Sequence, residues 1–224
     1  MPTLLLALLA AATSLASAQL SFPKSELGFI YKDGRPCADV KLAAYVDLTC
    51  PDSQASFGTL LQVAGNFTPF ELQLKLYLFS LPYHRNSHLI SKATRFLSSY
   101  FQSIKSNATA YDWIQLVYDN IDSLTTTATL NKTEGDVVNF LTALAQKLAP
   151  VTADAFRKGV YDSSIDSDTR LEWKYGCTRG VYGTPFFTIN DVFTTGDAAG
   201  WTPQYWVQLI KSLLPANSIT KQAC

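Results

Sequence analysis

The chain has 224 residues, with 18 Lys and Arg against 18 Asp and Glu, so its formal net charge at pH 7 is zero. Because no basic cluster breaks that balance, the sequence disfavours a nucleic-acid partner. Hydrophobic residues make up 47% of the chain, enough for one large core or a core with an inserted subdomain. Two histidines predict no metal centre, since zinc would need more ligands than their surroundings offer.

The first 18 residues have the pattern of a secretory signal peptide. An apolar run from Leu4 to Ala12 precedes the small-x-small sequence Ala16-Ser17-Ala18. No later segment has the run of about 20 apolar residues that a membrane span needs. We therefore expect residues 19–224 to form one mature domain, secreted or in the lumen of the secretory pathway and not bound to a membrane.

Three Asn-x-Thr sequons begin at Asn66, Asn107 and Asn131. They are candidate N-glycosylation sites and agree with a eukaryotic secretory route. The final Lys221 to Cys224 is not a KDEL-type retention signal, which favours secretion.

The first elements predicted along the chain are a short strand over 27–31 and a turn over 32–36. Residues 40–46 predict a mostly buried strand, and 54–64 continue as a helix with one apolar face. Cys50 stands between them, at the position of the helix N-cap.

The pattern then turns from strand to helix. Residues 72–81 predict a central parallel strand, and a helical period follows from about 86 to 172. A strand over 186–189 and a closing helix over 201–214 complete the chain. The expected helix starts within the long helical segment are Asp112, Thr133 and Thr152.

Cys50-Pro51-Asp52-Ser53 carries the strongest chemical signal. A sulfur at a helix N-terminus lies near unpaired N–H groups that favour the thiolate, and Pro51 suits the first helical position. Asp52 and the nearby Asp47 oppose that effect with negative charge. We expect a reactive cysteine, although this local pattern equally fits a small buried residue or half of a structural disulfide.

A second motif, Gly180-Val181-Tyr182-Gly183-Thr184-Pro185, enters the strand at 186–189 and is followed by an Asn-Asp turn. It resembles the cis-proline loop and terminal hairpin of thioredoxin-fold proteins. Together with the strand-Cys-Pro-helix unit upstream, the order of parts is similar to the DsbA-like family, over roughly residues 40–214. The resemblance implies an α/β thioredoxin-like fold, a central mixed sheet flanked by helices, with a helical subdomain inserted at approximately 86–172.

The resemblance also implies roles for individual residues. Cys50 would be the nucleophile, and a cis peptide bond before Pro185 would turn the Thr184 backbone toward it to bind an extended client strand. Pro51 and Tyr182 would lie beside the client. Tyr182, Phe186 and Tyr175 would form an apolar rim, unless they are simply core.

Ser53 departs from the two-cysteine pattern. A serine hydroxyl is not a useful nucleophile in thiol exchange, so an adduct on Cys50 must be released by an outside thiol such as glutathione, by the client, or by Cys177. A second departure is Ala44, where the related families often carry a buried carboxylate that assists proton transfer.

Four cysteines allow three complete pairings. In the topology implied by the resemblance, Cys37 and Cys224 lie far from the site, while Cys177 lies at the same end as Cys50. The resemblance therefore predicts a structural Cys37–Cys224 disulfide and leaves Cys50 and Cys177 as the redox-relevant pair.

Three functions remain open. The first is a secreted thiol-disulfide oxidoreductase that forms mixed disulfides with client protein thiols or disulfides through Cys50, without a bound cofactor. The second is a non-catalytic binding or chaperone-like module, favoured by Ser53 and Ala44. The third and weakest is a glutathione-binding transferase or isomerase similar to the kappa class. His84 has two interpretations, proton exchange with Cys50 or a surface or capping role.

Overall fold

A mixed five-stranded sheet in the order β1-β3-β2-β4-β5 forms the centre of the computed structural model, which describes residues 22–23 and 26–216. The strands are β1 (Phe29–Ile30), β2 (Val40–Val46), β3 (Leu72–Leu78), β4 (Phe186–Ile189) and β5 (Val192–Phe193). β2 is parallel to β3 and antiparallel to β4, so it lies in the middle of the sheet. The signal peptide predicted over 1–18 lies outside the described residues.

The two faces of β2 bury different clusters because its side chains alternate in direction. Leu42, Ala44 and Val46 belong to the main core, which α2 (Pro51–Ala64) and α8 (Pro203–Leu213) share. Tyr45 points to the other face, where it stacks on Tyr77 with ring centroids 4.8 Å apart. Burial on both faces explains why the central strands are almost continuously apolar.

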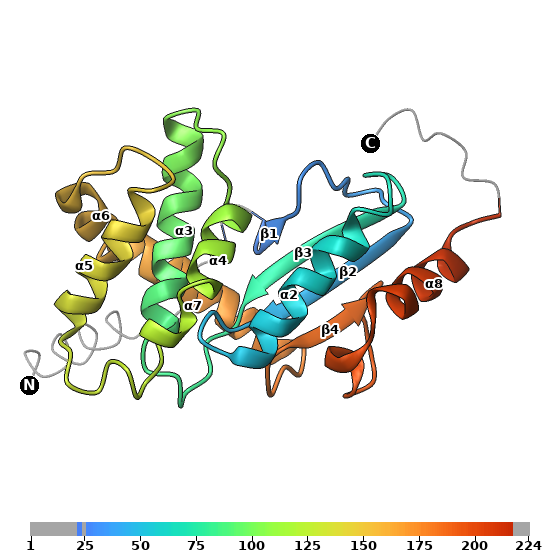
Figure 1. Cartoon of the computed structure of the whole chain (residues 1–224). Coiled ribbons are helices and arrows are strands. Elements are labelled where there is room, and N and C mark those ends of the chain that lie inside the picture. Colours follow the sequence, from blue (N-terminus) through green and yellow to red (C-terminus); the bar gives the residue numbers. More distant parts are fainter. Residues whose placement is uncertain (1–21, 24–25, 217–224) are drawn as a thin grey trace, which may run out of the picture.

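A group of helices occupies the chain between β3 and β4 (Figure 1). They are α3 (Ser87–Ser103), α4 (Ala110–Tyr118), the short η2 (Ile121–Ser123), α5 (Glu134–Ala145), α6 (Ala153–Val160) and α7 (Ser163–Thr178); η3 (Ala198–Gly200) precedes α8. The expected thioredoxin-like arrangement, a mixed sheet flanked by helices with a helical segment inserted, is confirmed. Within the described part of the chain, no helix has the length and apolar character to cross a membrane.

Local sequence determines several of the helix starts. Thr133 and Thr152 are the N-caps of α5 and α6, as predicted. The predicted start at Asp112 is wrong, because Thr109 caps α4 and Asp112 is the third helical residue. Asp112 accepts a hydrogen bond from the Thr109 backbone while the Thr109 hydroxyl accepts one from the Asp112 N–H, so the two form a reciprocal capping box.

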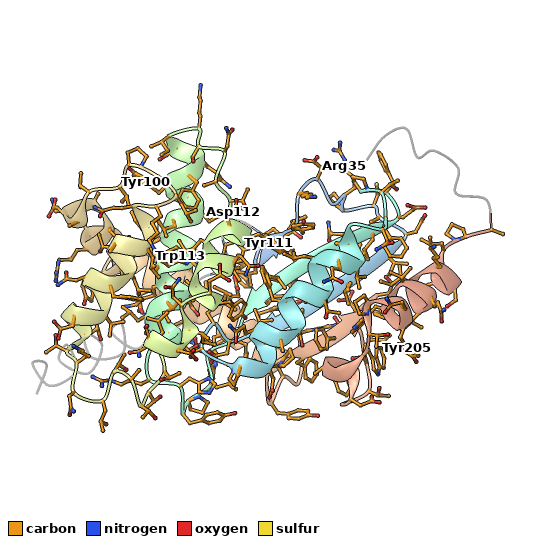
Figure 2. The ribbon with its side chains drawn as sticks, viewed as in Figure 1. Arg35, Tyr100, Tyr111, Asp112, Trp113 and Tyr205 are labelled. Atoms are coloured by element: carbon orange, nitrogen blue, oxygen red, sulfur yellow. The ribbon has the colours of Figure 1, made fainter. Side chains whose placement is uncertain are left out.

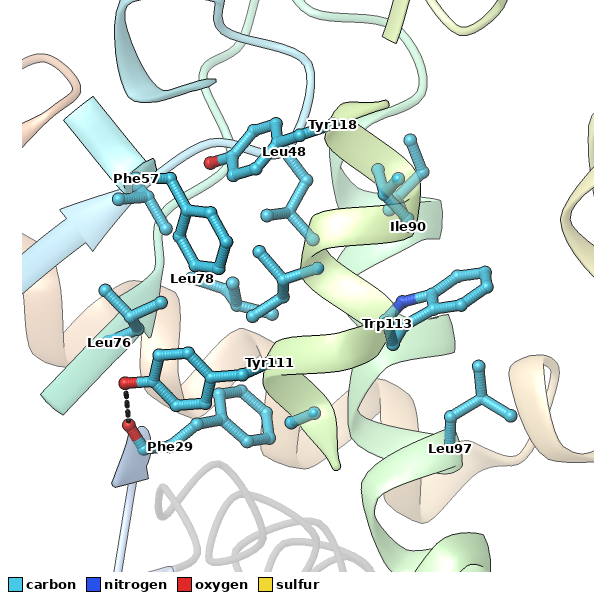
Figure 3. Packing of buried hydrophobic residues seen from close by; sticks show 14 of the residues in the cluster. Phe29, Leu48, Phe57, Leu76, Leu78, Ile90, Leu97, Tyr111, Trp113 and Tyr118 are labelled. Carbon is cyan, nitrogen blue, oxygen red and sulfur yellow. Dashed lines mark hydrogen bonds between the residues drawn. The ribbon is translucent and has the colours of Figure 1, made fainter. Parts of the chain in front are cut away.

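Helix α4 joins the helical segment to the sheet through two tyrosines (Figure 3). The Tyr111 hydroxyl donates a 2.9 Å hydrogen bond to the Phe29 carbonyl on β1, and Tyr118 packs against Phe57 of α2. Trp113 points to the opposite side, toward α3, where its indole N–H donates to the Thr94 hydroxyl (Figure 2). The helical segment and the sheet therefore share one core.

Glu172 on α7 carries a buried carboxylate. Asp162 begins α7 as its N-cap, and Glu172, further along the helix, is 1% exposed. Its carboxylate accepts hydrogen bonds from the N–H groups of Leu78 and Gly28 and pairs with Arg95. Burial raises the pKa of Glu172, against the opposing effect of Arg95 and the two N–H donors. One buried carboxylate thus ties α7 to β3, α3 and the start of β1.

Replacing Glu172 with glutamine should lower the free energy of unfolding by about 3 kcal/mol, because Arg95 would lose its charge partner in a site with little water. Chemical denaturation followed by circular dichroism measures the change. Glu134→Gln, on the exposed first turn of α5, is the matched control. Equal stability of the two variants would show that the buried pair contributes nothing.

The capping box of α5 predicts a dependence of stability on pH. Side-chain and backbone hydrogen bonds with Thr133 hold the pKa of Asp136 below its ordinary value. A lowered folded-state pKa stabilises the fold above the unfolded-state value, and the contribution disappears as the pH falls through the folded-state value, below about 4. Asp136→Asn should therefore lower the Tm at pH 7 and have a progressively smaller effect toward pH 3. Asp33→Asn, on an exposed turn, is the control and should show no such convergence.

Candidate active site

Cys50 lies at the junction of β2 and α2, where it is the N-cap and Pro51 the first helical residue, as predicted. It is a free thiol, 5% exposed, whose side chain makes no capping hydrogen bond. Its Sγ instead points to the distant Thr184 and donates to that residue's carbonyl oxygen at 3.3 Å. The structure therefore brings together the two motifs that the sequence singled out.

The loop that contacts Cys50 has the conformation that its sequence motif suggested. The peptide bond between Thr184 and Pro185 is cis. The Thr184 hydroxyl is buried and has no hydrogen-bond partner within the described part of the chain. A pocket of about 180 Å³ adjoins this loop, lined by residues 182–187 and 193–196.

Ser53 is fully buried, and its hydroxyl accepts a 3.3 Å hydrogen bond from the Asp47 N–H. In this arrangement the hydroxyl supports the turn that carries Cys50. Ser53 therefore has a structural role in this turn.

Asp47, three residues after Ala44, carries a buried carboxylate. Ala44 is a core residue of β2, whereas Asp47 follows the last residue of that strand and is 1% exposed. One carboxylate oxygen accepts hydrogen bonds from the backbone and hydroxyl of Thr49, at 2.7 and 2.8 Å. The other accepts the Leu81 N–H at 2.7 Å. The sequence placed Asp47 near Cys50 but did not predict its burial.

His84 completes the surroundings of Asp47. Its Nδ1 lies 3.1 Å from the carboxylate, within ion-pairing distance, although the ring is not oriented for a hydrogen bond. A protonated His84 would be attracted to Asp47 in this position. The Asp47 carboxylate therefore lies between His84 and the turn that holds Cys50.

Tyr118 enters the site from the helical segment, and no local sequence signal pointed to it. Its hydroxyl donates to the Asp47 carbonyl at 3.3 Å, the same carbonyl that accepts the Cys50 N–H. Burial raises the pKa of Tyr118 well above its ordinary value, with smaller contributions from Asp47 and Cys50. The phenol is therefore a neutral hydrogen-bond donor under the active-site turn (Figure 3).

Only one of the three aromatic residues proposed as a rim is strongly exposed. Tyr182 is 78% exposed and packs its edge against the Phe186 ring. Phe186 is 6% exposed, and it belongs with the half-buried Tyr175 to the second core cluster. Their rings fill the face of the sheet under α7, which accounts for their aromatic character.

The remaining cysteines leave the predicted pairing open. Cys177 is an exposed free thiol on the last turn of α7, with no bond to Cys50. Cys224 lies outside the described residues, so the Cys37–Cys224 disulfide stays a prediction. Asn66, Asn107 and Asn131 are exposed. Over the described ranges, no group of three or more His, Cys, Asp or Glu residues is arranged to hold a metal ion.

No protein-family model and no curated protein matches this chain. Several solved structures are similar to it. BdbD from Bacillus subtilis has a TM-score of 0.64 at 13% identity, with 83% of this chain and 92% of that chain covered. DsbA from Chlamydia trachomatis has a TM-score of 0.61 at 13% identity, with 88% and 95% covered. Alpha-DsbA1 from Wolbachia pipientis has a TM-score of 0.60 at 18% identity, with 87% and 92% covered. At these identities the likeness establishes the fold.

Asp47→Asn should lower the free energy of unfolding by about 1–3 kcal/mol. The asparagine amide would turn a donor toward one of the N–H groups that the carboxylate now accepts, leaving that group buried without an acceptor. Urea denaturation measures the loss. Asp52→Asn, on the exposed first turn of α2, is the control. A loss no larger than that of the control would contradict the structural role of Asp47.

Proposed function

We propose that this protein is a secreted thiol-disulfide oxidoreductase that works through one active-site cysteine. The observation that carries the proposal is the free thiol of Cys50, at the N-terminus of α2 and 3.3 Å from the Thr184 carbonyl that precedes the cis-proline. A helix N-terminus favours the thiolate, which is the reactive form in thiol-disulfide exchange. The likeness to disulfide oxidoreductases supports the same class of chemistry.

The reaction exchanges one disulfide for another. The Cys50 thiolate attacks a sulfur of a client disulfide, a Cys50–client disulfide forms, and the second client sulfur leaves as a thiolate. An outside thiolate, from glutathione or a client cysteine, then attacks the client sulfur of this mixed disulfide and releases the Cys50 thiolate. Each step forms one S–S bond and breaks one, so no further oxidant is needed.

The client segment would bind along the cis-proline loop. The Thr184 backbone would hydrogen-bond an extended client chain, with Pro51 on one side of the cysteine and Tyr182 on the other. The strong exposure of Tyr182 supports this role, because an aromatic ring on the surface offers apolar contact to a peptide. Secretion rests on the predicted signal peptide, and the three exposed sequons agree with it.

A second candidate is a binding module without turnover. The 5% exposure of Cys50 and the full burial of Ser53 favour it, since little of the cysteine is accessible and no second sulfur stands at the usual resolving position. The two candidates differ in one property, the reactivity of Cys50.

The direct test is alkylation of the mature protein by iodoacetamide across a pH series, read by mass spectrometry in a Cys177→Ser background. Cys50→Ser provides the blank. We expect iodoacetamide to label Cys50, and a bulky maleimide to label it more slowly because Cys50 is only 5% exposed. A Cys50 that stays unlabelled after mild reduction would reject the oxidoreductase and leave the binding module.

Oxidised glutathione tests the single-cysteine mechanism in the same background. The protein should accumulate a stable Cys50–glutathione disulfide, because Ser53 cannot displace it. Ser53→Cys should lower the steady level of this adduct at least about tenfold, since the new thiolate would attack Cys50 and expel glutathione. Ser53→Ala is the matched control and should retain the adduct. Equal adduct levels in all three proteins would contradict the proposed role of position 53.

A further inference from the structure

A pocket of about 410 Å³ lies beside the active-site turn, between the loop that follows β3 and the helices α3 and α7. Its volume is in the range of small-molecule sites. It is lined by Ser80, Leu81, Pro82, His84, Arg85, His88, Arg170 and Trp173. The two histidines of the chain, His84 and His88, therefore both face one pocket.

Arg85 places an unneutralised positive charge in the pocket wall. Its guanidinium donates to the carbonyl oxygens of Thr129 and Lys132, at 2.5 and 2.8 Å. Among the residues that the structure describes, no carboxylate pairs with it. Carbonyl groups hold the side chain in place without cancelling its charge.

Arg170 and His88 share a single carboxylate. Asp166 lies 3.1 Å from the Nε2 of His88 and 3.1 Å from the Nε of Arg170. Arg170 makes this contact through Nε, and no hydrogen bond to another described residue occupies its two terminal amino groups. Partial burial raises the pKa of Asp166, but His88, Arg170 and Lys92 outweigh it and leave that pKa below its ordinary value. The surroundings of Asp166 are thus dominated by positive charge.

Part of the pocket lining is apolar, and it lies next to Arg170 because Trp173 is three residues further along α7. The indole of Trp173 stacks on Phe79 with ring centroids 5.8 Å apart and an interplanar angle of 16°. Its N–H donates to the Ser80 carbonyl at 3.0 Å, and the residue remains 38% exposed. Leu81 and Pro82 extend this apolar lining. A flat apolar group can therefore lie beside the indole while a charged end reaches the arginines.

We propose that this pocket binds a small organic acid, a carboxylate on a flat apolar body. The terminal amino groups of Arg170 bind the carboxylate, as guanidinium groups do in bidentate pairs, with Arg85 adding positive charge. Trp173 and Pro82 contact the apolar body. The site does not depend on the redox chemistry of Cys50, although the contact between His84 and Asp47 connects its wall to the active-site turn.

The two histidines make binding directly observable. Their imidazole Hε1 signals are resolved in proton NMR, and both should shift saturably when benzoate is added at constant ionic strength, with a Kd on the order of 1 mM. Cys50→Ser is used throughout, so the outcome is independent of thiol reactivity. A shift that follows ionic strength and is reproduced by chloride would overturn the proposal.

Variants test the carboxylate-binding part and the apolar part of the pocket separately. Arg170→Gln should raise the Kd for benzoate at least about tenfold, whereas Arg157→Gln, an exposed arginine on α6, should leave it unchanged. Trp173→Leu should weaken benzoate but not inorganic phosphate, which has no apolar body. Unchanged benzoate binding in Arg170→Gln overturns the carboxylate contact. Phosphate binding as tight as benzoate, with no effect of Trp173→Leu, overturns the organic acid in favour of a general anion site.

Discussion

The Asp47 carboxylate is the constraint on which the rest of the site depends. It accepts the N–H groups of Thr49 and Leu81 and so joins the end of β2 to the loop after β3. The backbone of the same residue binds Ser53, Cys50 and Tyr118. Because the site is buried, the N–H groups that the Asp47 carboxylate accepts would stay unsatisfied without it. The position of Cys50 therefore follows from a network centred three residues upstream.

This network also explains why a serine fits well at position 53. The Ser53 hydroxyl is a hydrogen-bond acceptor for the Asp47 N–H, a role that a weakly accepting sulfur fills less well. A serine at this position supplies no resolving thiol, and its hydroxyl hydrogen-bonds within the turn that presents Cys50. Both features agree with the proposal that an outside thiol releases an adduct from Cys50.

The helical segment takes part in this arrangement rather than merely covering the sheet. Tyr118 reaches the active-site turn from the end of α4, while Tyr111 on the same helix bonds to β1. On α7, Glu172 ties the segment to β3 and Trp173 forms a wall of the basic pocket. Residues between β3 and β4 therefore contribute both to the turn that holds Cys50 and to the pocket that His84 lines.

Local sequence was sufficient wherever the deciding interaction lies within a few residues. The N-cap position of Cys50, the caps at Thr133 and Thr152 and the mostly buried strand over 40–46 are of this kind. The family resemblance added the partnership of Cys50 with the Thr184–Pro185 loop. The burial of Glu172, the core position of Phe186, the approach of Tyr118 and the contact between Asp47 and His84 were decided only by the tertiary structure. Each depends on partners far away in the chain. The local sequence around a charged or aromatic residue is the same whether its side chain faces water or contacts such a partner.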